Sequence, residues 1–250
     1  SQILQPLGVN PIQPQAVESN LNIIHIADSV QSSLNEYSPL YVEEGLHGGF
    51  SALAGNNSLV SDELVLSGQH GRWAFNVGQF HYDTDGFRPG ADITHDIYSV
   101  FLQNRLTDNL DIQLEYRDRE TDQGDLRQYF VINPTPVERQ FLDQQTLRLG
   151  LNWAITQRSR MLLSVTDIDR TTISVNALPA PSPTITDQFE REGQDIQLQY
   201  IHKARNYNLV AGLGKYDFDS HYIESLDFGF FQPPPTINDD EFKQDQAYVY

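Results

Sequence analysis

The chain has 250 residues, of which 34 are acidic and 16 basic, giving a formal net charge of −18 and a mean hydropathy of −0.46. This charge argues against binding to nucleic acid, whose phosphates require a basic protein surface. No run of eighteen apolar residues is present, which excludes a transmembrane helix in this sequence. The absence of cysteine excludes disulfide bonds, thiolate metal ligands and a cysteine nucleophile. A membrane-embedded β-barrel remains open, because its strands are apolar on one face only.

The N-terminal part has the composition of a linker. Residues 1–20 are polar and contain prolines at positions 6, 11 and 14. From Val17 to Leu34 the apolar residues form a partial helical stripe, which is equally compatible with a short helix and with an extended lead-in. We therefore expect residues 1–40 to be a linker with some helix, and residues 41–250 to form the folded part of the chain.

After Tyr41 the sequence alternates between apolar and polar residues, and no helical period competes with this pattern. Such alternation predicts half-buried strands and an all-β chain. The predicted strands are Leu46–Ala54, Leu59–Ser67, Arg72–Asp83, Asp96–Arg105, Leu110–Glu120, Gln145–Ala154, Arg160–Arg170, Gln194–His202, Tyr207–Asp217 and a last one from about Phe242 to Tyr250.

The predicted connections alternate between short and long. Residues 69–71, 106–109, 155–159 and 203–206 form short ones, and the polar segments 84–95, 121–144, 171–193 and 218–241 form long, acidic ones. An up-and-down antiparallel sheet places all short turns at one end and all long loops at the other, as membrane barrels do, whereas the Greek-key links of a soluble sandwich break this order. Predicted strand lengths of about 9–11 residues also suit a tilted membrane crossing. The predicted fold of residues 41–250 is an antiparallel up-and-down transmembrane β-barrel of the outer membrane, or a large part of one, with short periplasmic turns and long acidic outer loops.

Aromatic residues at or near the predicted strand ends agree with this fold. Girdles of Trp and Tyr mark the two membrane interfaces of barrels, although these residues favour strands in general. They are Trp73, Tyr82, Tyr98, Tyr116, Trp153, Tyr200, Tyr207 and Tyr216.

Two sets of residues are predicted to face different solvents. The lipid-facing set consists of Leu110, Ile112, Leu114, Tyr116, Leu147, Leu149, Leu151 and Trp153. The lumen-lining set consists of Asp111, Gln113, Glu115, Arg117, Arg148, Asn152, Asp195, Gln197 and Gln199. A polar wall keeps a channel hydrated, and its carboxylates are expected to favour cations. The alternative is that the charged face is the solvated exterior of a soluble sheet.

Catalytic and metal-binding signatures are lacking in the sequence. It contains no nucleophile elbow, phosphate-binding loop or zinc-protease motif, and although paired carboxylates are plentiful, no spacing favours a catalytic set. Acids and histidines surround one predicted loop, but without the fixed spacing of a known cation site. These residues are His81, Asp83, Asp85, Asp92, His95 and Asp96. We predict no enzymatic activity, no cofactor and no metal site.

The segment from Ser67 to Leu126 resembles the barrel of bacterial outer-membrane proteins that carry tetratricopeptide repeats ahead of it. The similarity rests mainly on VGQFHY at Val77–Tyr82, TDGFR at Thr84–Arg88 and GDL at Gly124–Leu126, and it extends more loosely over residues 35–217. The resemblance implies an outer-membrane barrel with more strands than this chain supplies and a periplasmic helical-repeat region upstream. It supplies no catalytic residues.

The sequence therefore predicts a pore or secretion conduit with a polar lumen in the outer membrane of a Gram-negative bacterium. One alternative is a closed barrel that acts as a surface interaction or structural module through acidic loops, and a weaker one is a soluble carbohydrate-binding β-sandwich. Expected partners are outer-membrane lipid and lipopolysaccharide, with a periplasmic helical-repeat domain or another subunit, and no nucleic acid.

Overall fold

The computed structural model describes residues 44–126, 138–177 and 182–250, and these form one antiparallel sheet of ten strands. In these ranges no helix is long and apolar enough to cross a membrane. The predicted linker at residues 1–40 lies outside the described residues. The strands are β1 Gly45–Ala54, β2 Val60–His70, β3 Trp73–Thr84, β4 Ile93–Thr107, β5 Leu110–Gln123, β6 Glu138–Thr156, β7 Ser159–Ala177, β8 Thr184–Lys203, β9 Asn208–Asp227 and β10 Thr236–Val249.

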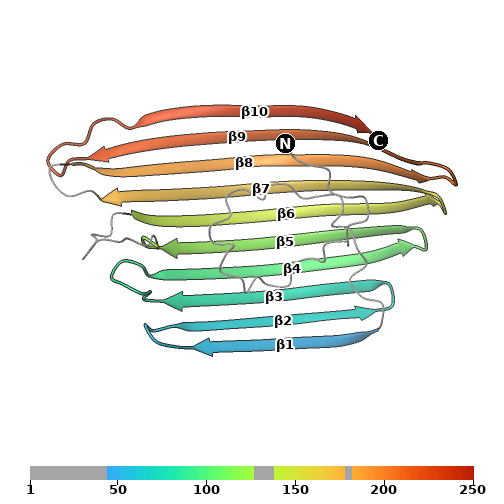
Figure 1. Ribbon diagram of the computed structural model, residues 1–250, viewed down its shortest axis with the longest axis horizontal. Helices are drawn as coiled ribbons and strands as arrows, with labels where there is room; N and C mark the ends of the chain where they lie inside the picture. Colours follow the sequence, from blue (N-terminus) through green and yellow to red (C-terminus); the bar gives the residue numbers. More distant parts are fainter. Residues whose placement is uncertain (1–43, 127–137, 178–181) are drawn as a thin grey trace.

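Each strand pairs with its neighbours in sequence, so the order in the sheet is β1 to β10 without a crossover (Figure 1). The predicted all-β, up-and-down architecture is confirmed, and each of the ten predicted strands is present. The sheet has the architecture of a large part of an up-and-down barrel, and among the described residues β1 and β10 form its two edges.

The two ends of the sheet differ, as predicted. The connections at residues 71–72, 108–109, 157–158 and 204–207 lie at one end, and those at residues 55–59, 85–92 and 228–235 lie at the other, where β5 and β7 also end and β6 and β8 begin (Figure 1). We call these the short-turn end and the long-loop end. Two of the tight turns are accompanied by register shifts, between Arg105 and Thr107 and between Ala154 and Thr156.

The predicted strand lengths of 9–11 residues are wrong for the C-terminal half of the sheet. β6 and β7 have 19 residues each, and β8 and β9 have 20 each. The additional residues extend the strands at the long-loop end, so the loops there are much shorter than predicted. Consequently many predicted loop acids, such as Asp122 and Asp239, lie on strands. Alternation failed in these parts because polar residues occupy both faces there, which removes the contrast that reveals a strand.

Burial in the sheet is inverted relative to a soluble protein. Leu46, Phe50, Leu149 and Leu213 are each at least half exposed, whereas Gln113, Thr166 and Asp195 are buried. Soluble proteins bury their aliphatic side chains and rarely expose a large contiguous apolar surface. One face of this sheet therefore requires an apolar environment.

Candidate functional site

Strand pairing assigns each predicted residue to a face, because directly paired residues in an antiparallel sheet point to the same side. Leu110, Ile112, Leu114 and Tyr116 pair with Trp153, Leu151, Leu149 and Leu147, respectively. The predicted lipid-facing set thus lies on one face, and we call its extension across all ten strands the apolar belt. Representative members are Leu46 and Phe50 in β1, Leu64 and Leu66 in β2, Val77 in β3, Leu102 in β4, Leu163 in β7, Leu198 in β8, Leu213 in β9 and Val249 in β10.

The apolar belt crosses the strands obliquely. The row of directly paired residues that begins at Leu66 in β2 is apolar as far as Leu147 in β6. It then becomes Asp167, Gln194 and Asp217 in β7, β8 and β9. In these later strands the apolar residues lie nearer the short-turn end. A membrane produces such a diagonal, because the strands of a transmembrane barrel tilt by about 35–45° from the membrane normal.

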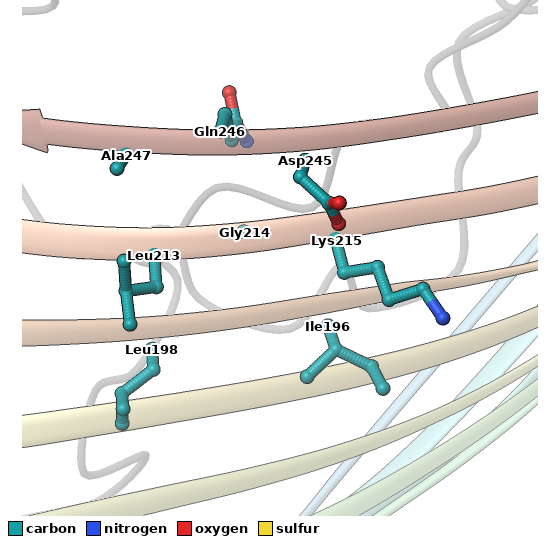
Figure 2. Close-up of a pocket in the computed structure, with 8 residues that line it drawn as sticks. All are labelled: Ile196, Leu198, Leu213, Gly214, Lys215, Asp245, Gln246 and Ala247. Atoms are coloured by element: carbon teal, nitrogen blue, oxygen red, sulfur yellow. The ribbon is translucent and has the colours of Figure 1, made fainter.

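Between β8 and β10 the belt contains a shallow hollow (Figure 2). Ile196, Leu198 and Leu213 line it with apolar side chains, and Ala247, which is paired with Leu213, contributes only a small one. At its margin toward the long-loop end stand Lys215 and Asp245, which are directly paired. The charged margin agrees with the diagonal course of the belt.

Part of the predicted aromatic girdle lies on the belt face. Trp153 and Tyr200 lie near the short turns, and Tyr98 and Tyr116 lie at the margin toward the long loops. Tyr82 and Tyr216 were assigned to the girdle wrongly. Tyr82 pairs with His95 and Tyr216 with Asp195, so both lie on the opposite face.

The nine predicted lumen residues all lie on the face opposite the belt, which we call the polar face. Asp111, Gln113, Glu115 and Arg117 pair with Asn152, Gly150, Arg148 and Thr146. Asp195, Gln197 and Gln199 continue this face through β8, opposite Thr166, Ser164 and Leu162 of β7. That this face lines a lumen remains a prediction.

Polar side chains on this face bond to one another across strands. Arg148 Nη1 lies 3.5 Å from Glu115 Oε2. Gln197 Nε2 donates to Asp195 Oδ2 at 2.8 Å and to the Tyr216 hydroxyl at 3.0 Å. Such bonds satisfy part of the polar groups buried on this face and connect side chains of neighbouring strands.

An apolar cluster on the polar face of β2 to β4 was not predicted. Phe80 and Ile97 are buried there, with Val65 and Tyr82 packed against them. The sequence did contain a signal for it, because large apolar or aromatic residues also occupy the face of β3 and β4 opposite the belt, at Phe80, Tyr82 and Ile97. The polar face is therefore fully hydrophilic only in part of the sheet.

At the long-loop end, two motifs that carried the family resemblance contact each other. Arg88 of TDGFR donates from Nη2 to the backbone carbonyl of Asp125 in GDL at 2.7 Å. The backbone NH of Gly124 donates to the carbonyl of Asp92 at 2.8 Å. Arg139 Nη1 and Nη2 donate to Asp92 and Asp122 at 3.0 and 2.7 Å. These bonds lock the β3–β4 connection onto the start of the β5–β6 connection.

The two histidines near this loop lie on opposite faces. His81 bonds through Nδ1 to Asp96 at 2.7 Å on the belt face, and His95 bonds to Thr121 at 2.7 Å on the polar face. They cannot share a metal ion across the sheet. In the described part of the chain, no three His, Asp or Glu side chains are arranged to hold one.

The fold and the two faces define a class, the antiparallel up-and-down sheet of β-barrel type with an exposed apolar belt. Among solved structures, the chain is similar to BauA, the ferric preacinetobactin receptor from Acinetobacter baumannii, with a TM-score of 0.55 and 8% sequence identity. The similarity covers 82% of this chain and 36% of that chain, so this chain spans about a third of the receptor's length. At this identity the likeness concerns the fold alone. No protein-family model and no curated protein matches the chain.

Proposed function

We propose that this sheet is part of the wall of a transport barrel in the outer membrane of a Gram-negative bacterium. In this proposal the apolar belt contacts lipid, and the polar face lines a hydrated path for solutes or polymer. No catalytic step is involved. Further strands of the same protein or of another subunit would cover the edges of β1 and β10, since unpaired backbone groups are unfavourable in lipid.

The diagonal course of the apolar belt is the observation that carries this proposal. A water-soluble sheet with a single layer would leave this belt in contact with solvent. A membrane about 30 Å thick accounts for its limited height and for its slant across tilted strands. The twenty residues of β8 span about 65 Å at 3.3 Å per residue. The strands therefore extend well beyond the membrane at the long-loop end.

On the belt face, the strands carry carboxylates immediately beyond the belt. Asp118, Asp169, Glu192, Asp219 and Glu241 occupy positions in or close to one row across β5 to β10. In the proposed orientation they stand at the level of lipid headgroups or just outside them. This acidic surface favours a second candidate function, a closed barrel that serves as a surface interaction module. The tetratricopeptide-repeat partner and contact with lipopolysaccharide remain part of the proposal.

Two measurements on the full-length protein test these assignments. We expect the protein to require detergent for monodispersity, and a monomer that remains folded in plain buffer would refute the membrane assignment. We further expect stepwise ion conductance after reconstitution into planar bilayers. A folded, inserted protein without conductance would exclude the conduit and leave the surface module.

A further inference from the structure

The hollow between β8 and β10 is an apolar recess in the belt that ends at charged residues. Leu198, Leu213 and Ala247 form one row of directly paired residues across the three strands and line its apolar end (Figure 2). The hollow has a volume of about 430 Å³, which lies within the range of small-ligand pockets, about 300–1,000 Å³. Because the side chains at this end are aliphatic, it fits a hydrocarbon chain and not a polar molecule.

Two of the three lysines of the chain stand at the charged end of the hollow. Lys215 lines it from β9, and its side chain points away from Leu213, toward the long-loop end (Figure 2). Lys243 of β10 lies on the same face, directly paired with Asp217. The Asp217 carboxylate is 3.5 Å from Lys215 Nζ and 3.8 Å from Lys243 Nζ, so it holds both ammonium groups close to the hollow.

Lys215 retains hydrogen-bond donors for a further anion. Its separation of 3.5 Å from Asp217 exceeds the length of a charge-assisted hydrogen bond, which is about 2.8 Å. An ammonium group has several N–H donors that rotate freely, and lysine binds phosphate as a compact point charge. A phosphate at the charged end of the hollow can therefore accept a hydrogen bond from Lys215 while the ion pair with Asp217 is kept.

A carboxylate stands beside this lysine and is open to a cation. Asp245 is exposed and is the direct partner of Lys215 across β9 and β10. Among the residues that the structure describes, the Asp245 carboxylate has no hydrogen bond or ion pair. The charged end of the hollow thus presents an ammonium group and a carboxylate side by side.

This alternation of charge matches a headgroup that carries both signs. A purely anionic headgroup would be attracted by Lys215 and repelled by Asp245 and Asp217. A phosphate and a primary ammonium joined by a short ethylene link place an acceptor at the lysine and N–H donors at the carboxylate. The order along the surface also agrees, because the apolar row of Leu213 is followed directly by the row of Lys215 and Asp245.

We propose that the hollow binds one zwitterionic phospholipid, with an acyl chain on Leu198, Leu213 and Ala247, its phosphate on Lys215 and its primary ammonium on Asp245. This inference rests on the proposed function, since it takes the belt face as the side that meets lipid. It goes beyond that function, because the rest of the belt requires only hydrocarbon, whereas this site selects a headgroup.

Binding is measured on the full-length protein, freed of lipid in a nonionic detergent, by native mass spectrometry after addition of phospholipids with identical acyl chains. The probes are phosphatidylethanolamine, phosphatidylcholine, whose ammonium has no N–H donor, and phosphatidylglycerol, which has no ammonium. We expect phosphatidylethanolamine to bind about tenfold more tightly than either of the others, as one additional charge-assisted hydrogen bond does.

Single substitutions separate the three parts of the site. Lys215→Gln should weaken phosphatidylethanolamine and phosphatidylglycerol about tenfold each, whereas Asp245→Asn should weaken only phosphatidylethanolamine. Ala247→Phe fills the hollow without a change of charge and should weaken all three lipids. The matched controls are Lys203→Gln, on the polar face at the short-turn end of β8, and Val100→Phe, in the belt of β4 outside the hollow; both should bind as the unmodified protein does.

The outcomes distinguish this site from the membrane assignment. Equal affinities for the three lipids, or phosphatidylethanolamine binding that is unchanged in both Lys215→Gln and Ala247→Phe, would overturn the inference. Tightest binding of phosphatidylglycerol would also overturn it, since the lysines alone would then attract the lipid. A protein that folds in detergent and inserts into bilayers without any lipid preference would refute this site and leave the proposed function intact. A folded monomer in plain buffer would refute both.

Discussion

Replacement of Leu198 by arginine tests which face of the sheet meets lipid. Leu198 lies in the apolar belt of β8 between Leu163 and Leu213, and its neighbour Gln199 lies on the polar face. An arginine near the bilayer midplane on the lipid side of a barrel reduces stability by about 2–4 kcal/mol. Gln199→Arg loses the hydrogen bond from Gln199 Nε2 to the Tyr248 hydroxyl at 3.0 Å, which contributes about 1 kcal/mol. We therefore expect Leu198→Arg to be more destabilising by about 1–3 kcal/mol.

The assay is urea-dependent folding of the full-length protein into lipid vesicles, followed by tryptophan fluorescence and by the shift in gel mobility that folded barrels show on heating. The two variants add the same side chain at adjacent positions, so differences in net charge and in the unfolded state cancel. If Gln199→Arg destabilises the protein as much as Leu198→Arg does, the assignment of the two faces is incorrect.

Three further substitutions test contacts within the sheet by the same assay. Arg88→Ala removes the guanidinium beside the carboxylate of Asp125, whose side chain is 1% exposed, and should reduce the free energy of unfolding by about 3 kcal/mol. No change would show that the contact between these two connections does not stabilise the protein. Arg139→Ala breaks two ion pairs at a side chain that is 42% exposed, so we expect the free energy of unfolding to fall by about 0.5 kcal/mol. This difference should disappear in 1 M salt, where charges are screened over about 3 Å. Gly193→Val forces the Phe218 ring out of its place and should destabilise by about 1–3 kcal/mol. Gly49→Val, at a site with no atom within 4 Å of an added Cβ, is its control, and equal effects would contradict the packing of the Phe218 ring over Gly193.

Period-2 alternation was sufficient to predict the strands wherever the two faces of the sheet differ in polarity. The segment from Leu147 to Trp153 illustrates this, because residues of the apolar belt and of the polar face alternate there without exception. The same signal disappears in the outer half of β8, Thr184 to Gly193, where neither face is apolar and backbone pairing alone defines the strand.

The composition of the polar face was predicted, but not the positions of its charges relative to one another. Arg117 and Arg148 could be assigned to this face from alternation, whereas Arg170 and Arg191 become neighbours only through the register between β7 and β8. Register depends on where each connection begins, and the boundaries at the long-loop end were the part that the sequence defined least clearly. The contact of Arg88 with Asp125 could not be predicted for the same reason, since these residues are 37 positions apart and meet only through the strand pairing.

The strand order of β1 to β10 makes the hairpin the unit of construction. Because none of the ten described strands pairs across a crossover, inserting or deleting one hairpin alters pairing only where the two flanking strands meet. A sheet built in this way can change its width by two strands at a time, while every remaining strand keeps the same residues on the belt face and the same residues on the polar face. A shift of register by a single residue has the opposite effect, since it would move the acids of one strand to the belt face and its leucines to the polar face. The number of strands in such a sheet can therefore change in evolution much more readily than the register between them.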